Sequence, residues 1–199
     1  MERTIVYFED MRAENTETTF RLVGERARML GIKKLVLAST TGATAMKAVE
    51  FFREKDVKLI VIPHQFGFRE THAFRQELVQ PIKEAGHEVH AGTMLFHTEN
   101  LYDSNVPTLM ANLLRCFCQG IKVCFEIALM ATDAGLVTIG EKVIAIAGTG
   151  HGADTALVMQ ASSSRNLKKL RVNEILCKPL NALNVEELRE WEKKFTDKA

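Results

Sequence analysis

Short apolar segments alternate with longer segments of helical period over the first half of the chain. We expect strands and helices in turn at 4–8, 15–30, 34–38, 43–54, 59–62, 71–85 and near 88–91. Gly31 and Gly86 end the first and the last of these helices. Apolar strands joined by helices imply parallel pairing, with helices on both faces of the sheet. The sequence therefore predicts an α/β fold with a mostly parallel, doubly wound sheet.

The alternation is lost in the middle of the chain. Residues 92–107 show no strong period, which is typical of a long loop. The following segment, 106–134, is apolar on almost all sides apart from an interruption at Gln119 and Gly120. Such a pattern predicts a helix that is mostly buried.

The last third of the chain returns to strand patterns. We expect strands at 142–147 and 173–177, and a short strand or helix at 155–159. Asn184 and Glu187 have the spacing of a capping box, which predicts a final charged helix. That helix carries Trp191 and Phe195.

Length and composition fit one globular domain covering 1–199. The 26 basic and 25 acidic side chains leave a net charge of +1, so nothing favours nucleic acid or a membrane as partner. The chain shows no signal-peptide pattern and no long apolar span, and we expect a cytoplasmic protein. The four cysteines have no metal-binding or Cys-x-x-Cys spacing, which indicates reduced thiols and no metal site.

A hydroxyl-rich turn follows the expected strand at 34–38. It reads Ser39-Thr40-Thr41-Gly42-Ala43-Thr44 and opens the helix at 43–54. The first N–H groups of a helix lack intrahelical partners and carry partial positive charge, so anions bind there. The hydroxyl groups add hydrogen-bond partners, and Gly42 lets a ligand approach the backbone. The alternative is that Ser39 or Thr41 only caps the helix.

Two other segments follow expected strands and so point to the same edge of the sheet. Gly148-Thr149-Gly150-His151-Gly152-Ala153-Asp154 forms either an anion-binding nest or a plain tight turn. Its spacing is neither that of a dinucleotide-binding fingerprint nor that of a Walker loop. His64, after the strand at 59–62, is either a ligand contact or a structural histidine.

Four charged residues lie on the apolar segment 106–134, at Arg115, Lys122, Glu126 and Asp133. Their spacing places them on one narrow stripe of a helix, and Lys122 and Glu126 form an i,i+4 pair. One interpretation is a solvent-facing stripe. The other is a polar wall that faces a ligand cavity.

The segment 18–63 resembles the C-terminal domain of pyruvate kinase. The similarity covers Gly-Ile-Lys-Lys-Leu-Val-Leu-Ala, Ser-Thr-Thr-Gly-Ala-Thr-Ala and Leu-Ile-Val-Ile-Pro with the helices between them. In that domain the hydroxyl-rich turn holds a phosphate of a sugar effector. Ala43 stands where pyruvate kinase often has a basic residue. The catalytic barrel has no counterpart here, so kinase activity is not expected.

A closer resemblance, in seven blocks spread over the chain, is to a family of stand-alone prokaryotic proteins with the same domain fold. The blocks include Ala38-Ser-Thr-Thr-Gly42, His64-x-x-Gly67-Phe68, Gln119-Gly-Ile-Lys-Val-Cys124 and Gly148-Thr-Gly-x-Gly-Ala-Asp-Thr-Ala156. This resemblance implies a three-layer α/β/α sandwich. It also implies a site for flavin mononucleotide (FMN) or a similar phosphorylated small molecule.

The resulting hypothesis is a binding protein for a phosphorylated small molecule, most readily FMN, at the C-terminal edge of the sheet. The expected site residues are Ser39, Thr40, Thr41, Gly42, Thr44, His64, Gly67, Lys122, Gly148, Thr149, Gly150 and Asp154. One alternative is an enzyme, either a flavin-dependent oxidoreductase or a hydrolase that uses His64 with Glu126 or Asp133. Another is a regulatory or structural homodimer that pairs through 106–134.

Overall fold

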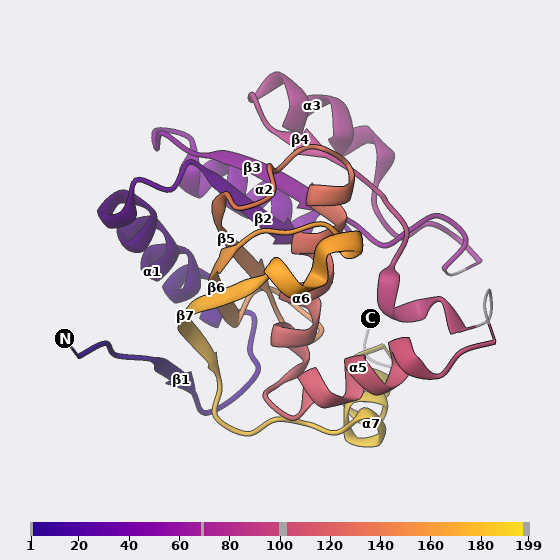
Figure 1. Cartoon of the computed structure of the whole chain (residues 1–199). Helices are drawn as coiled ribbons and strands as arrows, with labels where there is room; N and C mark the ends of the chain where they lie inside the picture. Colours follow the sequence, from indigo (N-terminus) through magenta and orange to yellow (C-terminus); the bar gives the residue numbers. More distant parts are fainter. Residues whose placement is uncertain (1, 69, 100–102, 197–199) are drawn as a thin grey trace.

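The computed structural model describes residues 2–68, 70–99 and 103–196 (Figure 1). Within these residues, seven strands form one sheet in the order β1-β7-β6-β5-β2-β3-β4. All neighbouring pairs are parallel except those that β6 makes with β5 and β7. The prediction of a mostly parallel α/β sheet is confirmed.

The first half of the chain follows the predicted alternation. The elements are β1 (Val6–Phe8), α1 (Asn15–Leu30), β2 (Lys34–Ala38), α2 (Ala43–Phe52), β3 (Lys58–Ile62), α3 (Val79–Glu84) and β4 (Glu88–Val89). Gly31 ends α1 with a left-handed backbone, φ +65°. The helix predicted at 71–85 is shorter than expected, since only a 3-10 turn at Gln76–Leu78 precedes α3. Pro81 lies in the first turn of α3, where its missing N–H costs no helical hydrogen bond.

The second half contains two helices before the sheet resumes. The elements are η2 (Leu95–His97), α5 (Val106–Arg115), α6 (Gln119–Asp133), β5 (Lys142–Ala147), β6 (Thr155–Gln160), η3 (Ser164–Lys169), β7 (Arg171–Pro179) and α7 (Val185–Thr196). The segment 155–159, left open between strand and helix, is the strand β6. Asn184 caps α7 as predicted, because its Oδ1 accepts hydrogen bonds from the N–H groups of Glu186 and Glu187, both at 2.9 Å. The side chain of Phe195 lies outside the described residues.

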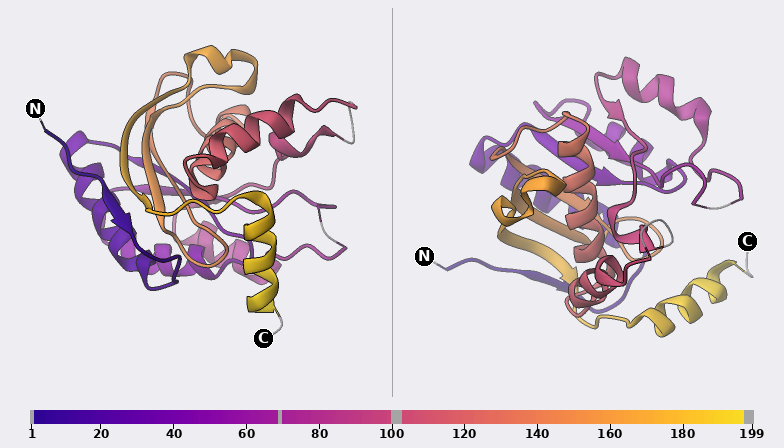
Figure 2. Two further views of the ribbon diagram at one scale, coloured as in Figure 1. Left: turned by 90° about the horizontal axis from the view of Figure 1, so that it is seen from below. Right: turned by 45° about the vertical axis from the view of Figure 1, so that its right-hand side comes forward.

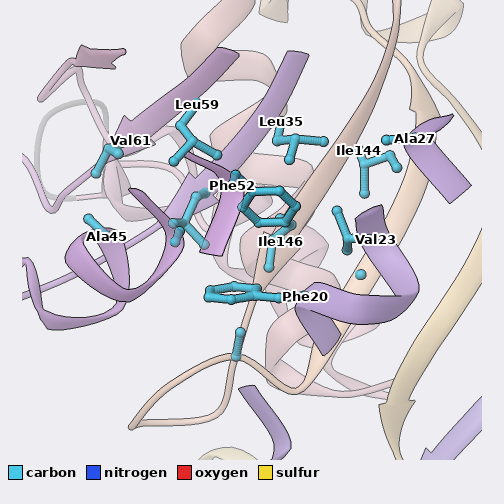
Figure 3. Close-up of a cluster of buried hydrophobic side chains, with 14 of the residues drawn as sticks. Phe20, Val23, Ala27, Leu35, Ala45, Phe52, Leu59, Val61, Ile144 and Ile146 are labelled. Carbon is cyan, nitrogen blue, oxygen red and sulfur yellow. The ribbon is translucent and has the colours of Figure 1, made fainter. Parts of the chain in front are cut away.

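Each face of the sheet carries its own hydrophobic core. On one face α1 and α2 cover alternate residues of β2, β3 and β5, with Phe20 and Phe52 packed over Leu35 and Ile146 (Figure 3). Their rings also contact each other, with centroids 5.5 Å apart. On the other face α6 covers the intervening residues, such as Val36 and Ala145. The views in Figure 2 show α1 and α5 on opposite sides of the sheet, which gives three layers.

The prediction that 106–134 is mostly buried holds for α6 and is wrong for α5. The chain turns between the two helices, and Cys118 caps α6 by accepting a hydrogen bond from the Ile121 N–H on its sulfur. Gly120 lies against Thr155 so closely that a Cβ would meet the hydroxyl at 2.1 Å. α6 is therefore held tightly to β6. α5 instead exposes large apolar side chains to solvent.

Candidate functional site

The loops that follow β2, β3 and β5 begin at the carboxyl ends of three neighbouring strands, along the same edge of the sheet. β2 pairs in parallel with both β3 and β5, so the three strands end at the same edge. The N-terminus of α6 is brought to this edge as well, because Gly120 contacts Thr155 at the start of β6. In open α/β sheets, ligands bind at the carboxyl ends of the strands. We call this region the carboxyl edge.

The hydroxyl turn at 39–44 uses part of its hydrogen-bonding capacity internally. Ser39 is buried, and its Oγ accepts a hydrogen bond from the Ala45 N–H at 3.2 Å. Thr41 Oγ1 accepts a long hydrogen bond from the Ala43 N–H at 3.4 Å. Thr41 and Ala43 are exposed, while Thr40 and Thr44 are half-buried. Helix capping is therefore present, and the turn still offers threonine hydroxyl groups at the N-terminus of α2.

Gly42 serves packing as well as the turn. Its φ of +94° favours glycine, and a Cβ there would lie 2.4 Å from Leu78 and 3.5 Å from Phe74. These side chains precede α3 and cover the Cα of Gly42. The expectation that this Cα lies open to a ligand is therefore wrong. Any anion would approach from the side of Thr41 and Ala43.

His64 joins the loop after β3 to the hydroxyl turn. Its Nε2 lies 3.5 Å from Thr40 Oγ1. Its backbone oxygen accepts a hydrogen bond from His72 Nε2 at 2.9 Å, and the His72 ring stacks on Phe66 at 3.9 Å. Gly67 takes a left-handed backbone in the same loop, φ +79°, with open space around its Cα. One loop therefore carries both the exposed ring of Phe66 and His64, and the imidazole of His64 approaches the hydroxyl turn.

The glycine-rich loop at 148–154 is held mainly by contacts within the protein. Asp154 is buried and accepts hydrogen bonds from the Thr149 N–H at 3.0 Å and the Thr155 hydroxyl at 2.7 Å. Burial raises the pKa of Asp154 against these hydrogen bonds. A Cβ on Gly148 would lie 2.5 Å from the backbone of Gly152. This geometry favours the interpretation of a tight turn.

A helix covers the tip of that loop. Trp191 of α7 packs against Gly150, where a Cβ would meet the indole ring at 2.1 Å. On the α1 side, the Ala153 N–H donates to Thr16 Oγ1 at 3.0 Å, and the Thr19 hydroxyl donates to the Ala153 oxygen at 3.1 Å. The loop lies beside the hydroxyl turn through the pairing of β5 with β2. Its Gly150 Cα is covered by Trp191.

Lys122 and Glu126 form a buried ion pair on α6, on the core side of the carboxyl edge. Their side chains are 2% and 3% exposed. The solvent-facing interpretation of the charged stripe is therefore wrong for these two residues. Glu126 Oε1 also accepts a hydrogen bond from the Phe96 N–H at 2.8 Å and lies 3.3 Å from His97 Nδ1. The Lys122 ammonium group lies over the Phe96 ring, 5.5 Å from its centroid.

The two charges respond differently to burial. Burial opposes ionisation of Glu126, but the hydrogen bond from His97 and the charge of Lys122 outweigh it and lower the pKa of Glu126 to about 2. Burial, with the nearby charge of Arg115, lowers the pKa of Lys122 against the attraction of Glu126. Glu126 is therefore a fixed negative charge near neutral pH.

The remaining charges of the stripe lie elsewhere. Asp133 is exposed at the far end of α6, where its Oδ1 accepts a hydrogen bond from the Ser164 N–H at 2.8 Å. Seven helical residues separate it from Glu126, a rise of about 10 Å. Arg115 is half-buried at the end of α5 and donates to Gln119 Oε1 at 2.8 Å. The structure brings Glu126 toward the carboxyl edge and leaves Asp133 at the opposite edge.

Sequence reasoning missed His97, Phe68 and Gln65. The rings of His97 and Phe68 meet edge to face at 5.0 Å, and Phe68 meets His64 in the same way at 4.9 Å. Gln65 Oε1 accepts a hydrogen bond from the Met94 N–H at 2.6 Å, which ties η2 to the loop after β3. His97 lies in a segment without any period, so only its tertiary contacts place it.

The family of the chain follows from a match to a protein-family model. The model of the pyruvate kinase alpha/beta domain matches residues 17–159. The chain belongs to this family. The expected relationship to the C-terminal domain of pyruvate kinase is thereby confirmed.

Solved structures of whole pyruvate kinases resemble part of this chain. A pyruvate kinase from Cryptosporidium parvum is 14% identical with a TM-score of 0.42, and the match covers 78% of this chain and 24% of that chain. A complex of the Cryptosporidium parvum enzyme with ADP is also 14% identical with a TM-score of 0.42, and the match covers 78% of this chain and 25% of that chain. A third structure of that enzyme is 16% identical with a TM-score of 0.37, and the match covers 67% of this chain and 21% of that chain. The chain thus corresponds to about a quarter of these enzymes or less.

The part of the chain that the structure describes contains neither a membrane-spanning helix nor a cluster of metal ligands. None of its helices combines the length and the apolar character needed to cross a bilayer. Its His, Cys, Asp and Glu side chains form no group of three that could hold a metal ion.

Proposed function

We propose that this protein binds a phosphorylated small molecule at the carboxyl edge, and that FMN is the first candidate. The observation that carries the proposal is the approach of His64 Nε2 to Thr40 Oγ1, 3.5 Å apart, at the N-terminus of α2. Two loops from adjacent strands thereby present hydrogen-bonding groups to one place. The N-terminal dipole of α2 favours a negative charge there.

The residues present fit the chemistry of FMN at both of its ends. Thr40, Thr41 and Thr44 carry hydroxyl groups suited to a phosphate, and none of the three is fully buried. Phe66 is an exposed aromatic side chain, 63% exposed and backed by the stacked ring of His72. Such a surface suits a planar heteroaromatic ring. When bound, FMN would supply redox chemistry, while the protein groups named here would hold and orient it.

The direct test is calorimetric titration of the purified protein with FMN, with riboflavin and with inorganic phosphate. We expect FMN to bind more tightly than riboflavin, because only FMN carries the phosphate. Removing one hydroxyl partner from the phosphate by Thr40→Val or Thr41→Val should weaken FMN binding by about tenfold to a hundredfold, since hydrogen bonds to charged groups contribute about 1.5–3 kcal/mol. Thr138→Val, an exposed threonine between α6 and β5, is the matched control.

Equal affinities for FMN and riboflavin, or unchanged FMN affinity in both turn variants, would overturn the assignment of the phosphate site. The absorption spectrum of the freshly purified protein, with mass spectrometry of anything released on denaturation, tests the identity of the ligand separately. Reduction of a bound flavin by a nicotinamide donor at catalytic rates would extend the function to an oxidoreductase.

A second candidate function is a homodimer formed through α5. One face of this helix carries Val106, Leu109 and Leu113, and Phe117 follows in the turn after it; each of the four side chains is more than half exposed. The face holds no charged side chain, so two copies can meet about a two-fold axis without like-charge repulsion. Large exposed apolar patches mark interaction sites.

The dimer is tested by light scattering across a concentration series. Leu109→Glu should shift the protein to a monomer, because it introduces two like charges into the interface. Leu180→Glu is the matched control, since Leu180 is also exposed but lies beyond β7. A wild-type protein that stays monomeric at millimolar concentration excludes this role for α5.

A further inference from the structure

The buried carboxylate of Glu126 contacts two groups of the short helix η2, the backbone N–H of Phe96 and the ring of His97. Its Oε1 accepts a hydrogen bond from the Phe96 N–H at 2.8 Å and faces His97 Nδ1 at 3.3 Å. A carboxylate accepts hydrogen bonds and donates none when ionised. For Nδ1 to donate to Glu126, this nitrogen must carry the proton, and in the neutral ring Nε2 is then left without one.

The backbone around His97 is fixed on both sides. The Met94 N–H donates to Gln65 Oε1 at 2.6 Å, and the His97 N–H donates to the Met94 oxygen at 3.0 Å. The Thr98 hydroxyl donates to the Leu95 oxygen at 3.2 Å. His97 is therefore held in position by backbone contacts as well as by its ring.

The charged groups around this histidine form a compensated set. Lys122 is paired with Glu126, and the charge of Glu99 also favours the protonated form of Lys122. Arg115 contributes a further positive charge that is felt by both Lys122 and Glu126. Since Lys122 balances Glu126, the carboxylate persists in a buried place where an isolated one would be costly.

The side chain of His97 is not fully enclosed. It is 24% exposed, and its ring contacts Phe68, which contacts His64 in turn. His64 is the residue that approaches the hydroxyl turn through Thr40. A series of ring contacts therefore leads from the expected phosphate site to His97.

We propose that Glu126 is a positioning residue that holds His97 as the Nδ1–H tautomer, so that His97 Nε2 accepts a proton from a ligand bound at the carboxyl edge. A proton from an acidic O–H or C–H group of the ligand passes to Nε2, and its bonding electrons stay on the ligand. The resulting imidazolium is stabilised by the Glu126 carboxylate and returns the proton to the ligand or to water. The ligand part of this proposal rests on the proposed function, whereas the tautomer does not.

The tautomer is tested by ¹⁵N NMR of the ligand-free protein at pH 8. We expect the His97 Nδ1 resonance at the position of a protonated nitrogen and Nε2 at that of an unprotonated one. The variant Lys122→Met/Glu126→Leu removes the acceptor without leaving a buried charge, and should lose this preference. Lys122→Met/Glu126→Gln keeps an acceptor oxygen and should retain it. A His97 that is protonated on Nε2 in the wild-type protein overturns the proposal.

Reactivity tests the role of the carboxylate charge. An unprotonated imidazole nitrogen attacks diethyl pyrocarbonate and becomes acylated, and peptide mass spectrometry reports the rate at each histidine. His97 should react several-fold faster in the wild-type protein than in Lys122→Met/Glu126→Gln, because the carboxylate stabilises the positive charge that develops on the ring during acylation. His90, which is half-buried beyond β4, is the internal reference and should not change. Equal rates at His97 exclude the proposed effect of Glu126.

Saturating FMN should protect His97 from this reagent. If FMN binds by calorimetry but leaves His97 as reactive as before, His97 is not the proton acceptor for that ligand and the proposal fails. If FMN does not bind at all, the proposed function fails for FMN. The NMR and reactivity results still decide whether Glu126 positions His97.

Discussion

Glu126 forms a buried ion pair with Lys122, which lies one helical turn earlier on α6. The Lys122 ammonium group also lies over the ring of Phe96. Removing one member leaves the other buried without its ion-pair partner, which costs about 3–5 kcal/mol. We expect Lys122→Met to lower the free energy of unfolding by this amount in urea titrations. The paired variant Lys122→Met/Glu126→Leu should lose much less, since well-packed apolar residues replace buried ion pairs at little cost. A single variant as stable as the paired one would show that the pair is solvated in solution.

Acid should destabilise the protein partly through Glu126. Its pKa is lowered from the usual 4.5 to about 2 in the folded protein, so the unfolded chain takes up the proton first as the pH falls. The stabilisation is fully present above pH 4.5 and is lost toward pH 2, by up to roughly 3 kcal/mol. Urea titrations at a series of pH values should show a steeper acid loss in the wild type than in Lys122→Met/Glu126→Leu. Parallel curves would contradict the assignment.

The packing of α7 depends on the absence of a side chain at Gly150. Gly150→Ala would place a Cβ 2.1 Å from the Trp191 ring, on a backbone with φ +83°. Gly140→Ala is the matched control, because its φ is +89° and no atom lies within 4 Å of a Cβ there. Overpacking should make the Gly150 variant about 1–3 kcal/mol less stable than the control. Fluorescence of Trp191, the one tryptophan of the chain, should shift toward that of an exposed indole only in Gly150→Ala.

Thiol reactivity should distinguish one cysteine from the other three. Cys116 is exposed at the end of α5, whereas Cys118, Cys124 and Cys177 are buried. Burial raises the pKa of all three, that of Cys177 to about 12, so their reactive thiolate forms are scarce. Ellman's reagent should titrate one thiol in the native protein and all four in denaturant. Cys116→Ser should abolish the native signal, and a second fast thiol would contradict the burial of the other three.

The sequence predicted the parts of the fold that depend on local pattern. The strands β2, β3 and β5 and the helices α1 and α2 lie close to the predicted ranges. The capping box at Asn184 formed as its spacing indicated. These features follow from apolar periodicity and from the unsatisfied N–H groups at a helix start, which are local properties of the chain.

The burial of the charged stripe could not be predicted from local sequence pattern. A polar stripe on an apolar helix has the same spacing whether it faces water or a polar contact inside the protein. Lys122 and Glu126 are buried because η2, with Phe96 and His97, folds over them from a segment without any period. The exposed face of α5 was likewise misjudged, since composition alone does not tell which apolar helix receives a covering layer.

The amino-acid sequence by itself determined the alternating layers and the hydroxyl turn at the start of α2, because backbone geometry and side-chain period act between near neighbours. Only the tertiary structure decided that β5 lies beside β2, that Trp191 covers Gly150 and that His97 meets Glu126. These contacts join residues far apart in the chain, and the hydrophobic driving force that brings them together does not depend on sequence order.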